Sequence, residues 1–168
     1  MKAKLVVEGK EFDIDILDSE LEKLVKPPKK TGYERLNIGY PYYTVGRNGL
    51  TEQLTEMNDD IDTMIYDAAN YYSDQTVVEN NARADRLMRQ LRRFSVFQRD
   101  DNLDWNKEKQ CKFCICYNYY NAELYVVDIC NTRHMFNIYF HSESCANAVI
   151  ELFHDELIWY FTEYKDSL

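Results

Sequence analysis

The pattern of apolar and polar positions predicts two main helices. Between Gln75 and Gln98, apolar or small residues recur every three or four positions, as on the buried stripe of an amphipathic helix. The members of this stripe are Ala84, Leu87, Met88, Leu91 and Phe94 or Ser95. Ser73 or Asp74 stands before it as a suitable N-cap, and Ser142 stands before a second stripe. That second stripe contains Ala146, Val149, Ile150, Phe153, Leu157, Tyr160 and Phe161.

Short runs of strand-forming residues between turn signals predict antiparallel strands. Residues 112–118, 123–130 and 135–141 are expected to form a three-stranded meander, with turns at 118–121 and 131–134. The stretch YPYYTVGRNGLTEQ predicts a hairpin around Arg47-Asn48-Gly49, which can supply a turn with positive φ. The acidic stretch after it is expected to be irregular, with a short strand or a turn of helix.

The first 31 residues are expected to stand apart from the rest. KLVVEGKEFDIDI predicts a hairpin with its turn at Glu8-Gly9, and a short helix over Leu21, Leu24 and Val25 should follow. The consecutive prolines of KPPKK end that helix. We therefore expect an appendage (residues 1–25), a linker (26–31) and a core domain (32–168). Strands and helices in blocks predict an α+β fold, in which an antiparallel sheet of hairpins and meander packs against two main helices.

Charge favours a protein partner over nucleic acid. The chain has a formal net charge of −9, and residues 31–80 hold 9 acidic but only 2 basic side chains. An acidic surface repels phosphates and accelerates the encounter with a basic protein. No apolar run is long enough to span a membrane, and the first residues do not resemble a secretory signal, so we expect a cytoplasmic protein.

The same segment contains the residues that we expect to contact a partner. Carboxylates alternate with tyrosines there, which can imitate a nucleic-acid backbone and provide rigid interface anchors. The predicted partner-binding residues are Asp59, Asp60, Asp62, Asp67, Tyr66, Tyr71 and Tyr72. A solvated acidic loop is the alternative. A calcium loop is disfavoured because the glycine and the terminal glutamate are missing at the required spacing.

Three of the five cysteines lie in QCKFCICY, where Cys111 and Cys114 have C-x-x-C spacing. On a strand these two side chains point to opposite faces, which favours buried thiols over a shared metal ion. Further residues at ligand spacing are Cys130 with His134, and His141 with Cys145. A zinc-stabilised protein is thus an alternative, but we assign no metal ligand and no cofactor.

No sequence motif for catalysis is present, so we expect no enzymatic activity. Cys145, one turn from His141, could be read as a nucleophile, but no third group to orient the pair is identifiable. The long helix also carries five arginines: Arg83, Arg86, Arg89, Arg92 and Arg93. A solvated face is the favoured interpretation of these arginines, and a nucleic-acid-binding accessory protein is the alternative.

Several segments resemble a family of small acidic proteins of temperate phages and prophages of Firmicutes. These segments are YPYYTVGRNG, ANYYSD, NNARADRLMRQLRRF, DWNKEKQCKFCI and DELIWYFTEYKDSL, and the resemblance covers about residues 28–168. The family's short, acidic, accessory character is similar to that of anti-defence proteins, including type II-A anti-CRISPRs that block Cas9. The resemblance implies a phage-encoded, non-enzymatic inhibitor of a host defence nuclease, with Cas9 as the favoured target in the bacterial cytoplasm. It assigns no functional residue.

Overall fold

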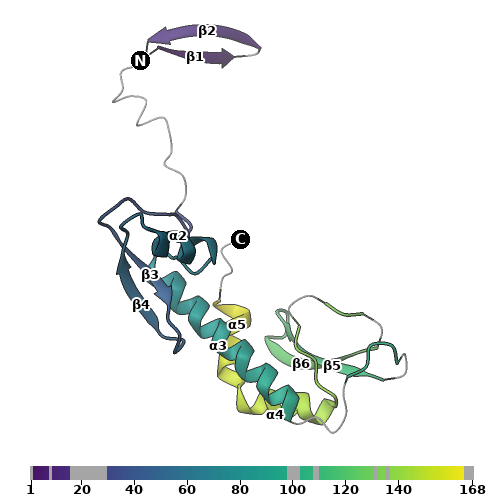
Figure 1. Cartoon of the computed structure of the whole chain (residues 1–168). Coiled ribbons are helices and arrows are strands. Elements are labelled where there is room, and N and C mark those ends of the chain that lie inside the picture. Colours follow the sequence, from purple (N-terminus) through teal and green to yellow (C-terminus); the bar gives the residue numbers. More distant parts are fainter. Residues whose placement is uncertain are drawn as a thin grey trace. The chain divides into compact units, whose positions relative to one another are not determined.

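The computed structural model describes residues 2–7, 9–15, 30–97, 103–107, 110–130, 132–134 and 137–164. The chain divides into two compact units, Met1–Thr31 and Gly32–Leu168. Mixed helices and antiparallel strands make the fold α+β (Figure 1).

The first unit contains one hairpin. Strands β1 (Lys2–Val7) and β2 (Lys10–Asp15) are antiparallel, with the first residue of β1 opposite the last residue of β2. Gly9 has a φ of +79°, which glycine adopts without the steric cost of a side chain, so the predicted turn position is confirmed. The expected helix over Leu21–Val25 and most of the expected linker, residues 26–29, lie outside the described residues.

The second unit begins with the predicted tyrosine-rich hairpin, which is confirmed as β3 (Pro41–Val45) and β4 (Thr51–Thr55). Two helices follow it, α2 (Asp60–Asp67) and α3 (Gln75–Phe97). The observed bounds of α3 agree with the predicted helix to within one residue.

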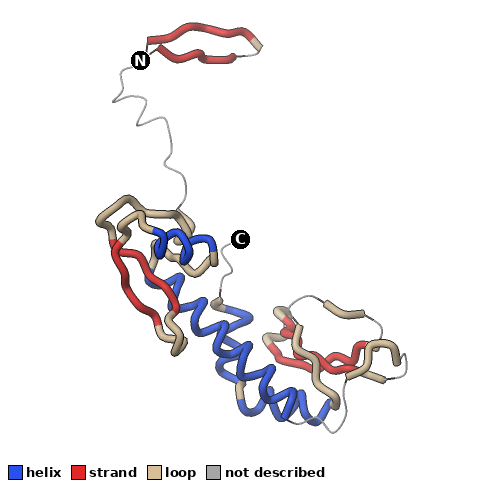
Figure 2. The backbone as a smooth tube through the Cα atoms, viewed as in Figure 1, coloured by secondary structure: helices blue, strands red, loops and turns tan. Residues whose placement is uncertain are grey.

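The remaining elements are the hairpin β5 (Lys112–Asn118) and β6 (Glu123–Ile129), followed by α4 (Glu143–Leu152) and α5 (His154–Thr162). The predicted N-cap Ser142 is confirmed, because its hydroxyl accepts a hydrogen bond from Cys145 N–H at 3.2 Å. The strands of the described residues form three separate two-stranded sheets (Figure 2).

The core lies where α3 meets the hairpin β5–β6 and the two last helices. Leu87 and Leu91 of α3 pack against Phe140, Val149 of α4 and Leu157 of α5. Inward-facing apolar residues of β5 and β6 cover this cluster from the other side: Phe113, Ile115, Leu124 and Val126. The helical stripes that the sequence predicts are therefore the faces that the structure buries.

The third strand of the predicted meander does not form as predicted where the structure describes it. In the described part of residues 135–141, only Phe140 forms a bridge, and it pairs with Phe113 of β5 rather than with β6. Tyr139 explains why the pairing ends there. Its carbonyl accepts a hydrogen bond from the Ser95 hydroxyl at 2.9 Å, so a side chain of α3 replaces a strand partner.

Two further predictions need correction. The last helix is divided at Phe153, whose φ of −121° and ψ of 21° interrupt the helical path between α4 and α5. The acidic stretch that was expected to be irregular forms the regular helix α2, because it begins with a capping arrangement described below.

Candidate functional site

Helix α2 starts with a reciprocal cap formed by two aspartates. The N-cap Asp59 accepts a hydrogen bond from Asp62 N–H at 2.9 Å, and the Asp62 carboxylate accepts one from Asp59 N–H at 3.4 Å. These bonds satisfy N–H groups that a helix start otherwise leaves without partners. The preceding residue, Asn58, has a φ of 57°, which turns the chain sharply into the helix.

Asp62 is a buried anchor and not a surface charge, since its side chain is only 4% exposed. Its Oδ1 accepts a hydrogen bond from the Tyr42 hydroxyl at 2.8 Å, and its Oδ2 accepts one from Met57 N–H at 2.7 Å. Burial raises the pKa of Asp62, but these hydrogen bonds outweigh it, and the net pKa is lowered. The carboxylate therefore fastens α2 to β3.

Glu56 provides a second buried carboxylate in the same segment as Asp62. The side chain is 1% exposed and accepts hydrogen bonds from Arg35 at 3.2 Å and from Asn58 N–H at 2.9 Å. Tyr71 stacks on Tyr42 with ring centroids 4.0 Å apart, and burial raises its pKa to about 12. Carboxylates and tyrosines of this segment thus build an internal network under α2.

This network corrects part of the predicted partner surface. Asp62, Tyr71 and Tyr72 are buried against β3 and cannot anchor a partner. The other predicted residues remain on the surface: Asp59, Asp60, Asp67 and Tyr66. Sequence reasoning treated every acid and tyrosine in the segment alike, although the spacing of Asp59 and Asp62 already matched a helix cap.

The outward side of α2 carries an exposed patch that the sequence analysis missed. Asp60, Met64 and Asp67 follow one another at helical spacing, and Ile61 lies beside Met64. Ile61 is 64% exposed and Met64 71% exposed. We call these four residues the α2 face. The spacing of positions 60, 61, 64 and 67 could be seen in the sequence. It predicts a shared face only if the segment is known to be helical.

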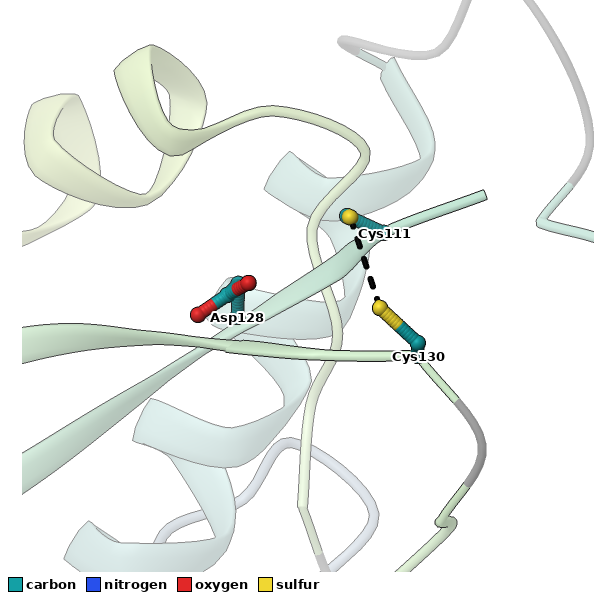
Figure 3. Close-up of side chains that lie close together, drawn as sticks. All are labelled: Cys111, Asp128 and Cys130. Atoms are coloured by element: carbon teal, nitrogen blue, oxygen red, sulfur yellow. Dashed lines mark hydrogen bonds between the residues drawn. The ribbon is translucent and has the colours of Figure 1, made fainter. Parts of the chain in front are cut away.

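A second cluster lies at the open end of the hairpin β5–β6. Cys111 and Cys130 extend the ladder by one position beyond the pair Lys112 and Ile129, and their Sγ atoms are 3.4 Å apart. Asp128 lies two residues before Cys130 on the same face, and one carboxylate oxygen is within 4.8 Å of both sulfur atoms. Figure 3 shows the two sulfur atoms directed toward each other.

The other thiols are separated from this pair. Cys114 is not part of the cluster of Cys111, Asp128 and Cys130, in agreement with the alternation of faces along a strand. It is buried, and burial, with Cys116 beside it, raises its pKa to about 12. Burial also raises the pKa of Cys145, which is opposite to what a helix-terminal nucleophile requires. His134 is exposed and does not join the cysteine cluster.

The arginines of α3 divide into one structural residue and four exposed ones. Arg83 donates two hydrogen bonds to Glu156 of α5, at 2.8 and 3.0 Å, and its guanidinium lies 3.9 Å from the ring centroid of Trp159. It thus joins α3 to α5 and buries an aromatic side chain. The exposed arginines are Arg86, Arg89, Arg92 and Arg93.

An apolar cavity of about 540 Å³ lies beside the core, between α3, β5 and α5. Leu91, Cys114, Phe140 and Phe161 are among the residues that line it. Burial raises the pKa of the Cys114 thiol in this lining, which keeps the thiol protonated near neutral pH.

Comparison of the chain with protein-family models, with curated proteins and with solved structures gave no match. Within the described residues, no helix has the length and apolar character needed to cross a membrane.

Proposed function

We propose that this protein is a non-enzymatic binding protein whose α2 face occupies a basic surface of a partner protein. The observation that carries the proposal is the exposure of Ile61 and Met64 between the carboxylates of Asp60 and Asp67. Neighbouring apolar side chains that a fold leaves in water are typical of interaction sites when polar residues surround them. Methionine suits such a surface because its flexible side chain adapts to a partner.

The support beneath the α2 face strengthens this proposal. The reciprocal cap at Asp59 and Asp62, together with the stacked rings of Tyr42 and Tyr71, holds α2 against β3. A preorganised surface loses little conformational entropy when it binds. Carboxylates at the rim of such a surface accelerate the encounter with a basic partner and make binding sensitive to salt.

The resemblance to phage proteins extends the proposal to a named class of partner. We propose that the protein is a phage-encoded inhibitor of a host defence nuclease, with Cas9 as the first target to test. Effectors of this class hold a guide–target duplex in a positively charged channel. An acidic helix with an apolar ridge has the charge and shape to compete for such a channel, and stoichiometric occupation would block DNA.

Binding to purified Cas9–guide complex is measured by biolayer interferometry at two salt concentrations. This experiment tests both the α2 face as the binding surface and Cas9 as the partner. The double variant Asp60→Lys/Asp67→Lys should weaken binding at least about tenfold and reduce its salt dependence. The matched control Glu151→Lys/Asp155→Lys makes the same change in net charge at exposed positions of α4 and α5. It should leave the affinity within about threefold of the wild type.

A third variant separates charge from apolar contact. Met64→Ala should lower the affinity about fivefold or more with little effect on the association rate, because a buried apolar anchor acts mainly on dissociation. Equal weakening by the α2 variant and the control would assign the effect to net charge and overturn the α2 face. Absence of binding at micromolar concentrations, with uninhibited DNA cleavage, would overturn Cas9 as the partner.

A further inference from the structure

The register of β5 and β6 places three donors on one side of the hairpin. Cys111 and Cys130 are opposite each other, and Asp128 is two positions away on the same strand as Cys130. Residues that are opposite, or two apart on one strand, share a face of a sheet. The backbone pairing therefore brings Asp128 near the two sulfur atoms, as Figure 3 shows, with the three ligand atoms within 4.8 Å of one another.

The distances fit a tetrahedral metal ion with a small adjustment. Zn–S bonds of about 2.3 Å put two tetrahedral sulfur ligands about 3.8 Å apart, and the two Sγ atoms here are separated by 3.4 Å. Small rotations of the two side chains can move the sulfur atoms apart by the few tenths of an ångström that are missing. Asp128 is exposed, so its carboxylate can turn toward the sulfur atoms without disturbing the core.

The charges near the cluster fit a bound dication as well. Lys112 is fully buried, and its ammonium donates hydrogen bonds to the carbonyls of Gln110, Lys107 and Cys130, at 2.8 to 3.5 Å. Among the described residues it forms no salt bridge. A dication held by two thiolates and one carboxylate carries a net charge of about −1, which this ammonium balances.

We propose that Cys111, Cys130 and Asp128 bind one thiophilic divalent cation of the zinc type. On binding, the two thiols each release a proton to solvent, and the cation forms two metal–sulfur bonds and one metal–oxygen bond. The fourth position remains for water or for a ligand from another molecule. Such a site clamps the open end of the hairpin β5–β6, far in sequence from α2, and is independent of the function proposed above.

Metal binding to the reduced full-length chain tests the proposal directly. Chelator-treated protein is titrated with Zn²⁺ and, in a parallel experiment, with Co²⁺, whose charge-transfer absorption reports thiolate ligands. We expect one equivalent of Zn²⁺ with submicromolar affinity, thiolate-to-cobalt absorption, and release of about two protons. Cys111→Ser and Cys130→Ser should each weaken binding by about a hundredfold, and Asp128→Asn by about tenfold.

Cys116→Ser is the matched control, since Cys116 lies on the other face of β5 and is also half-buried. It should leave the affinity for metal unchanged, and circular dichroism checks that all variants are folded. Three results would overturn the proposal: no stoichiometric metal in the wild type, equal weakening by Cys116→Ser, or cobalt binding without thiolate absorption. A disulfide between Cys111 and Cys130 that persists in the reduced protein, identified by peptide mapping, would also overturn it.

Discussion

The replacement Asp62→Asn gives the strongest test of how α2 is held in place. The two carboxylate oxygens accept hydrogen bonds from the Tyr42 hydroxyl and from Met57 N–H, at 2.8 and 2.7 Å. Asparagine has a single acceptor oxygen, so one of these donors would face an NH₂ group. A hydrogen bond to a charged group contributes about 1.5–3 kcal/mol, and an unsatisfied buried donor costs about 1–3 kcal/mol. We expect the variant to lower the free energy of unfolding by about 2–4 kcal/mol at neutral pH.

Urea denaturation followed by circular dichroism measures this loss. The midpoint of unfolding should fall by about 1 M or more, given the usual urea dependence of small proteins. Asp60→Asn is the matched control, because Asp60 is exposed on the same helical turn. It should cost no more than about 1 kcal/mol, the usual value of a charge at a helix start. Equal losses in the two variants would refute the anchoring role of Asp62.

The difference between wild type and Asp62→Asn should also depend on pH. The folded protein lowers the pKa of Asp62, as a consequence of hydrogen bonds that outweigh burial. The contribution of the carboxylate is thus complete above the pKa of the unfolded chain, near 4, and is lost as the pH falls through the folded pKa. We expect the difference to be constant between about pH 7 and pH 5 and to shrink toward pH 3. A difference that does not change over this range would contradict the argument.

Three further predictions concern other parts of the second unit. Gly32→Ala should destabilise the protein by about 1–3 kcal/mol in urea denaturation, because Gly32 has a φ of +90° and a Cβ there would lie 2.6 Å from Val77 Cγ2. Native Cys114 should react with iodoacetamide near pH 8 about a thousandfold more slowly than an unfolded thiol, since its pKa is raised to about 12; rapid alkylation, read by mass spectrometry, would contradict this. Arg83→Lys should cost about 0.5–1.5 kcal/mol because a lysine cannot form the paired hydrogen bonds to Glu156, and an unchanged melting temperature would argue against that link.

The candidate sites show what a sequence pattern conveys and what it omits. The high density of carboxylates and tyrosines singled out residues 59–72 in the sequence, but it could not separate Asp60 on the surface from Asp62 in the interior. Burial depends on which residues of β3 and α3 come to lie over the segment. Tyr42 is distant from Asp62 along the chain, and their hydrogen bond exists because the fold brings them together.

The cysteine cluster depends on the length of one turn. The predicted turn at residues 118–121 would place Cys111 opposite Asp128, whereas the predicted strands 112–118 and 123–130 leave the loop 119–122 that is observed, which places Cys111 opposite Cys130. Ala122, with a φ of 55°, allows the longer loop. A shift of two residues keeps every side chain on the same face, so the alternation of faces was predictable but the partner was not.

Local signals were sufficient for several elements of this protein but not for α2, for the third predicted strand or for the break at Phe153. Caps, turn residues and hydrophobic periodicity act over a few neighbouring positions. The positions of α3, of the hairpins β3–β4 and β5–β6, and of the N-cap Ser142 are all of this kind. Burial and pairing depend on contacts between residues far apart in the chain. For that reason only the tertiary structure shows that Asp62 is internal and that the α2 face is exposed. It also decides that Phe140 pairs with β5 and that Cys111 lies next to Cys130.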